Sequence, residues 1–168
     1  MSSRYIDPII EKYRSLIMTN CSSIKSFFQG EPTRIPASLL PCLIISKSQT
    51  EVRQFTNAED EHAIGLNIIL ITDIRQDLST NENDSKIVEG ISSLYDIIEG
   101  RNADYALKNT SILGILRTNQ LVDVDNNLRT DLRTISRVAY GETLRDRNAE
   151  QWTIEARLQV VATYSQVR

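Results

Sequence analysis

Cysteine, histidine and long apolar runs are scarce in this chain of 168 residues. Two cysteines, Cys21 and Cys42, are too few for a disulfide scaffold or a cysteine zinc site, so we expect both to be small buried hydrophobes. Apolar runs such as IILI at 68–71 fall far short of a membrane span, and the first residues lack the apolar core of a signal peptide. These absences predict a soluble protein that is made in a reducing compartment and does not contact membranes.

The usual sequence signs of catalysis and of ligand binding are also missing. The patterns GxGxxG, GxxxxGK[ST], HExxH and GxSxG do not occur. The single histidine, His62, would need a nucleophile and an orienting partner that no pattern places. The acidic run at 59–61 lacks the glycine and the distal glutamate of an EF-hand, and so does the run that starts at Asp123. We therefore expect no catalysis, no metal and no cofactor.

The residues that are present indicate one globular domain over 1–168. Apolar residues make up 40% and charged residues 24% of the chain, and the sequence has no internal repeat. Apolar residues recur at three- and four-residue steps in three segments, which predicts amphipathic helices over about 5–19, from Asn83 or Asp84 to Gly100, and over 110–117. Thr110 or Ser111 would cap the third helix.

Runs of β-branched and aromatic residues predict strands at 24–29, 42–48, 62–74 and 134–140, with a further short strand possible at 121–124. The strands at 42–48 and 62–74 should pair as an antiparallel hairpin. We expect polar loops at 49–61 and 141–150 and a turn at 125–131. Gly65 lies inside a strand pattern, which indicates a β-bulge or the close approach of another backbone. Gly90 and Gly114 lie inside helix patterns, and a close helix–sheet contact would explain all three glycines.

The segment from Gln151 to Arg168 alternates between apolar and polar residues almost without error. Such a period of two predicts a strand about twice the usual length, with one face packed and one face in solvent. Its expected buried residues are Trp152, Ile154, Ala156, Leu158, Val160, Ala162 and Tyr164.

The order of elements predicts an α+β fold. Strands are grouped together and helices are grouped together, which is typical of a mostly antiparallel sheet with helices on one side. We expect four to five strands, with two to three helices packed on one face.

Arginine is the one unevenly distributed residue, because lysine is absent after Lys108 while eight arginines follow it. Acidic residues are interspersed among these arginines, so the region has mixed charge. The arginines could form ion pairs at an interface, belong to an ordinary solvated surface or contact passing nucleic acid. A net charge of −3 disfavours general nucleic-acid binding. The candidate subunit or partner interface comprises Glu59, Asp60, Glu61, Arg129, Arg133, Arg137, Arg145, Arg147, Glu155 and Arg157.

Several segments together carry a family resemblance. They are YIDPIIEKYRSLI, IKSFFQGEP, SLLPCLIIS, TNAEDEHAIGLNIILITD, IVEGISSLYDIIEGR, SILGILR, RVAYG and QWTIEARLQVVATYSQ. In this layout of hydrophobic patterns and turns, the chain resembles the tail terminator (tail completion) proteins of tailed bacteriophages over nearly its whole length.

The resemblance implies a structural virion protein without an active site. Such proteins form a hexameric ring that caps the tail tube and joins it to the neck, so the expected partners are like copies, a tail tube protein and a neck connector, with a sheath as a further candidate. DNA would pass through the ring without specific binding. The chain would be made in the host cytoplasm and located in the virion. Other neck or head-completion proteins, a cellular adaptor domain, and a small enzyme with a dispersed site around His62 remain alternatives.

Ring closure by head-to-tail contacts needs two different complementary patches on each subunit. The acidic residues 59–61 and the arginines between Arg129 and Arg147 are the expected pair.

Overall fold

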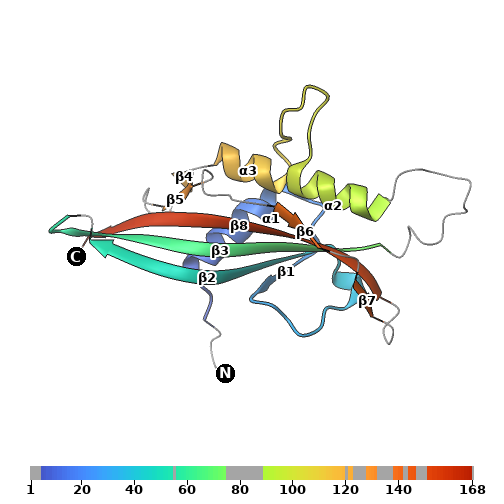
Figure 1. Cartoon of the computed structure of the whole chain (residues 1–168), viewed down its shortest axis with the longest axis horizontal. Coiled ribbons are helices and arrows are strands. Elements are labelled where there is room, and N and C mark those ends of the chain that lie inside the picture. The colour runs from blue at the N-terminus through green and yellow to red at the C-terminus, as the bar shows by residue number, and fades with distance from the viewer. Residues whose placement is uncertain are drawn as a thin grey trace, which may run out of the picture.

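The computed structural model describes residues 5–54, 56–74, 89–119, 121–122, 128–131, 138–141, 144–146 and 151–167 (Figure 1). Three α-helices and one short 3₁₀ helix are present in these ranges: α1 (Pro8–Asn20), α2 (Glu89–Glu99), α3 (Ile112–Thr118) and η1 (Ala37–Leu39). The strands are β1 (Ser26–Gln29), β2 (Cys42–Gln54), β3 (Glu59–Asp73), β4 (Leu121–Val122), β5 (Leu128–Asp131), β6 (Val138–Tyr140), β7 (Leu144–Asp146) and β8 (Gln151–Val167).

All eight strands of the described ranges belong to one sheet. The sheet is at most five strands wide at any level, because β5, β6 and β7 pair in succession with the same edge of β8. The remaining strands follow in the order β8, β3, β2 and β1, and β4 adds two residues outside β5. β1 runs parallel to β2, and every other pair is antiparallel. The predicted α+β class with a mostly antiparallel sheet is confirmed.

The three helices pack on one face of the sheet and form the main core with it. Each helix contributes one apolar stripe, and β2, β3 and β8 contribute the inward residues of the sheet. The stripes are Ile10, Tyr13 and Ile17 of α1, Leu94, Ile97 and Ile98 of α2, and Ile112, Ile115 and Leu116 of α3. The opposite face carries a smaller cluster of Leu40, Cys42, Ile44 and Ile69, with Ile35 of the β1–β2 connection packed against it.

The alternation of the final strand is confirmed by the burial of its side chains. Ile154, Ala156, Leu158, Val160 and Ala162 are buried against the helices, whereas Arg157 and Gln159 are exposed. Trp152 and Tyr164 lie at the two ends of this stripe and are partly buried. Both cysteines are buried and unpaired, as expected.

Three segments that we expected to be loops or turns contain strands. β2 continues to Gln54 and β3 begins at Glu59, so most of 49–61 is a strand pair. Residues 128–131 and 144–146 are the strands β5 and β7, added to the edge of β8. These residues show no apolar alternation, and their strand state depends on hydrogen bonds to β3 and β8, which are distant in sequence.

Two glycines lie at close contacts. Gly65 faces a β-bulge in β2 between Lys47 and Gln49, and an added Cβ would lie 2.5 Å from Ser48 Oγ. Of the expected alternatives for Gly65, the structure shows a bulge, which lies in the partner strand β2 and not in β3. At Gly114 an added Cβ would overlap the backbone carbonyl of Lys108, so the close contact joins α3 to the α2–α3 loop and not to the sheet.

We expect Gly114→Ala to lower the free energy of unfolding by about 1–3 kcal/mol, because the Lys108 carbonyl is held backbone and α3 must shift. Gly65→Ala is the matched control: its nearest neighbour is a hydroxyl that can rotate away, so the loss should stay below about 1 kcal/mol. Chemical denaturation of both variants checks this. Equal losses would contradict the distinction.

Candidate functional site

The long strands extend past the helix layer as a three-stranded arm (Figure 1). We define the arm as residues 50–54 of β2, 59–63 of β3 and 163–167 of β8. The strands stay in register along it, with Val52 opposite His62 and His62 opposite Tyr164. Val52 is 59% exposed, although apolar side chains at equivalent places nearer the helices are buried. The outer part of the arm therefore presents both faces to its surroundings, while Tyr164 at its base is partly buried against the core.

The outer edge of β2 is open along the arm. β1 pairs with β2 only from Cys42 to Ile45, and from residue 46 to Gln54 the described residues supply no strand on this side. An open strand edge offers backbone amides and carbonyls to another chain, and charged side chains are a common protection against random pairing. Here Arg53 and Glu51 supply such charges and form an ion pair at 2.9 Å.

The acidic residues 59–61 lie in β3 itself and not in a hairpin loop, which corrects our expectation. Because side chains alternate in a strand, Asp60 points to the helix side and Glu59 and Glu61 to the opposite side. Glu61 is paired in register with Arg53 of β2 and with Ser165 of β8. The three carboxylates therefore form an acidic arm end and not one cluster, and the described residues contain no group able to hold a metal ion.

The predicted arginines are not gathered at one place within a subunit. Arg129 lies opposite Thr163 and Arg145 opposite Trp152, so eleven residues of β8 separate them, about 36 Å at 3.3 Å per residue. They share the outer row of strands beside β8. Arg133, Arg137 and Arg147 lie outside the described residues.

Glu155 and Arg157 are brought together on the face opposite the helices. Arg157 donates from Nε to Glu155 Oε1 at 2.8 Å, and its Nη1 lies 3.8 Å from Glu31 Oε1. The hydrogen bond to Glu155 and the charge of that carboxylate raise the pKa of Arg157. The Arg157 side chain is 51% exposed and that of Glu155 only 19%. The two charges are paired within the subunit, so they offer another protein a surface of mixed charge.

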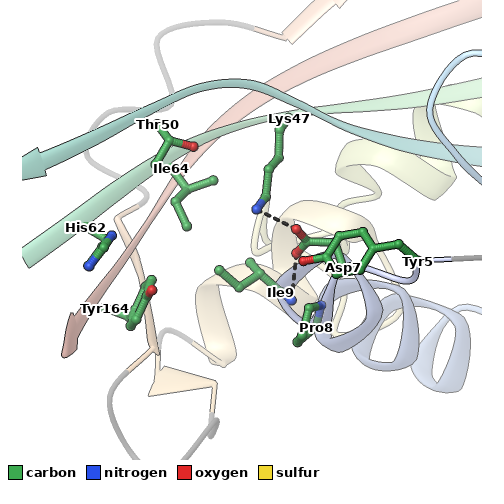
Figure 2. A pocket seen from close by; sticks show the side chains of 9 residues that line it. All are labelled: Tyr5, Asp7, Pro8, Ile9, Lys47, Thr50, His62, Ile64 and Tyr164. Carbon is green, nitrogen blue, oxygen red and sulfur yellow. Dashed lines mark hydrogen bonds and ion pairs between the residues drawn. The ribbon is translucent and has the colours of Figure 1, made fainter.

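A pocket of about 370 Å³ lies where the base of the arm meets the start of α1 (Figure 2). Its lining combines apolar walls with aromatic rings and a few polar groups. The lining residues are Tyr5, Asp7, Pro8, Ile9, Lys47, Thr50, His62, Ile64 and Tyr164.

Asp7 closes one end of the pocket and is held by several partners. Its side chain caps α1 by accepting hydrogen bonds from the amides of Ile9 and Ile10, and it pairs with Lys47 Nζ at 2.5 Å. Burial raises the pKa of Asp7, but the hydrogen bond from Lys47 and those from the two amides outweigh burial, so the net pKa is lowered. Pro8, which follows Asp7, indicated the helix start in the sequence. The ion pair with Lys47 could not be predicted, because no sequence pattern connects these two distant residues.

The lowered pKa of Asp7 predicts a pH dependence of stability. The ionised carboxylate stabilises the fold above its ordinary pKa of 3.8, and this contribution is lost as the pH falls through the lower pKa of the folded state. Asp7→Asn keeps a cap but loses the ion pair, which is worth about 1 kcal/mol because Lys47 is one-third exposed. Denaturation should show this difference at pH 7 and a progressively smaller one as the pH falls below 3.8. A difference independent of pH would contradict the assignment.

His62 lies at the other side of the pocket from the Asp7–Lys47 pair (Figure 2). Its ring stacks on Tyr164, with centroids 4.6 Å apart and an angle of 14° between the planes. The two rings form one aromatic wall. The geometry thus places His62 in one wall of the pocket, and the carboxylate of Asp7 on the other side is bound by Lys47 and by the amides of the helix start.

None of the helices in the described ranges has the length and apolarity needed to cross a membrane. Comparison of the sequence with protein-family models and with curated proteins finds no match.

Proposed function

We propose that this chain is a structural virion protein of a tailed phage, a tail terminator that assembles into a hexameric ring, caps the tail tube and joins it to the neck. The arm supports this proposal most directly. Its β2 edge is open from residue 46 to Gln54 within the described part of the chain, and a second chain can complete it by strand addition. Such an extension contributes little to a monomer's core, so its length makes sense as a contact surface.

The charge distribution supports head-to-tail assembly. Glu59 is paired with Val167 at one end of β8, and Arg145 is paired with Trp152 at the other, about 50 Å away along the strand. Two different patches at opposite ends of a subunit are what a closed heterologous ring needs. In this proposal the acidic arm end of one copy meets the end of the next copy that carries Arg145, whereas Arg129 lies beside the arm itself.

The ring works through surfaces and not through chemistry. Tail tube protein and neck connector bind its two sides, a sheath is a further possible neighbour, and DNA passes through its opening without sequence-specific contacts. The polar groups of the pocket suit this role because Asp7 is bound by Lys47 and His62 is stacked on Tyr164.

Labelling of the virion tests the assignment. A gold-conjugated antibody against the chain should mark one position on each particle, at the junction between tail and neck. Purified chain should also bind one end of isolated tail tubes of the same virus. Label on the capsid or along the tube, or on no part of the particle, would contradict the proposal.

A further inference from the structure

We infer that Tyr105 of one copy inserts into the pocket at the base of the arm of a second copy. This inference rests on the proposed ring and names one of its contacts. It depends on two features at different places on the subunit: an exposed tyrosine on a firmly held loop, and a pocket whose walls suit a phenol ring.

The loop between α2 and α3 is held by its own hydrogen bonds. The amide of Asn102 donates to the carbonyl of Ala106 at 2.8 Å, that of Tyr105 to Asn102 at 3.0 Å, and that of Lys108 to Gly100 at 2.7 Å. Arg101 adds a bond from Nη1 to the carbonyl of Tyr105 at 3.0 Å. A loop that is ordered before binding loses little conformational entropy when it docks.

Tyr105 is the side chain that this loop presents. It is 80% exposed, the largest exposure among the large apolar side chains described, and its φ of 64° lies in the left-handed region, which is unusual for a residue other than glycine. Tyrosine is enriched among the residues that dominate the energetics of protein interfaces. Figure 1 shows the loop projecting from the helix layer away from the sheet.

The pocket matches a phenol ring in shape and in polarity. Its aromatic wall of His62 and Tyr164 offers a ring to stack against, and Ile9 and Ile64 add apolar contact. A cavity of about 150 Å³ is enough for benzene, so about 370 Å³ accepts a tyrosine side chain with part of its backbone. Thr50 and Lys47 supply polar atoms for the hydroxyl.

The occupant comes from another copy. The loop projects from the side of the helices away from the sheet, whereas the pocket lies against the strands, so a subunit's own Tyr105 does not fill it (Figures 1 and 2). Of the other exposed tyrosines described, Tyr5 already lines the pocket and Tyr95 packs edge-on against Tyr140. A knob and a pocket at separate places form a head-to-tail contact, as a ring requires.

Photo-crosslinking tests the contact directly. Chain carrying p-benzoylphenylalanine at position 105 is mixed with ¹⁵N-labelled wild-type chain, irradiated and digested. We expect crosslinks from position 105 to labelled peptides that contain Thr50, His62 or Tyr164. Crosslinks to other parts of the labelled copy, or a ring without any crosslink between copies, would overturn the inference.

Variants give an independent readout by native mass across a dilution series. Tyr105→Asn removes the phenol group and keeps a residue type that tolerates the left-handed backbone conformation. Thr50→Trp fills the pocket with a large side chain from an exposed position. Each variant should weaken assembly at least tenfold. Leu39→Ala, on the other face of the sheet, is the control and should change nothing. If the wild-type chain assembles and both variants assemble equally well, the inference fails while the ring stands. A wild-type chain that stays monomeric would refute both.

Discussion

Replacing Leu158 by alanine should lower the free energy of unfolding by about 2–5 kcal/mol, the usual loss when a buried leucine is truncated. Leu158 is fully buried in β8 against the helices. It faces Ile68 of β3 and Val138 of β6, so the cavity left by alanine would lie in the middle of the main core. Urea denaturation of the purified variant measures the loss.

Arg157→Ala is the matched control, because it changes the neighbouring residue on the opposite face. Its ion pairs with Glu155 and Glu31 are half-exposed and contribute at most about 1 kcal/mol. The variant should therefore keep its stability, and it should assemble less well if this face contacts another subunit. A loss for Arg157→Ala equal to that for Leu158→Ala would mean that the two faces of β8 have been assigned the wrong way round.

Reversing the charge of the acidic arm end should abolish ring formation while leaving the monomer folded. The triple variant Glu59→Lys, Asp60→Lys and Glu61→Lys places cations on the arm end, which faces arginines of the next copy in the proposed ring. Like charges brought into contact oppose association, and these three side chains lie at the far end of the arm from the core. Native mass and circular dichroism together show whether assembly is lost and the fold kept.

The neutral triple variant Glu59→Gln, Asp60→Asn and Glu61→Gln separates charge from shape. This variant should weaken assembly of the ring less than the charge reversal does. Raised salt concentration should also weaken assembly of the wild-type chain, because it screens the attraction between the charges. Rings that form equally well after full charge reversal would show that the arm end does not face the arginines.

The core of the fold could be predicted because its signals are local. An apolar period marks the side of a strand or helix that meets the core. The period is two over 151–168 and three to four residues around Tyr13 and Leu94, and the apolar sides of these elements are buried in the structure. Ser111 caps α3 by accepting a hydrogen bond from the amide of Gly114, as the residue type suggested.

The arm could not be predicted in the same way. Apart from Val52, residues 49–54 and 59–61 are polar, because they contribute no side chain to the core, and without alternation a strand resembles a loop in sequence. β5 and β7 are strands because the edge of β8 pairs with them, which is a tertiary effect. For the same reason the sequence identified the charged residues but not their separation along β8.

The pocket was hidden from sequence analysis because its parts come from four distant segments. Asp7 and Lys47 lie forty residues apart, and His62 meets Tyr164 across a pairing of β3 with β8. Only the single histidine stood out beforehand, and the structure places it in an aromatic wall and not beside a nucleophile.

The mass of the purified chain under native conditions tests the central claim most directly. The claim is that the arm and the arginines beside β8 join copies of this chain. The account predicts a closed species of six times the 19.1 kDa chain mass, which dissociates when the arm end is reversed in charge. A species of 19.1 kDa at every concentration, up to the limit of solubility, would contradict it.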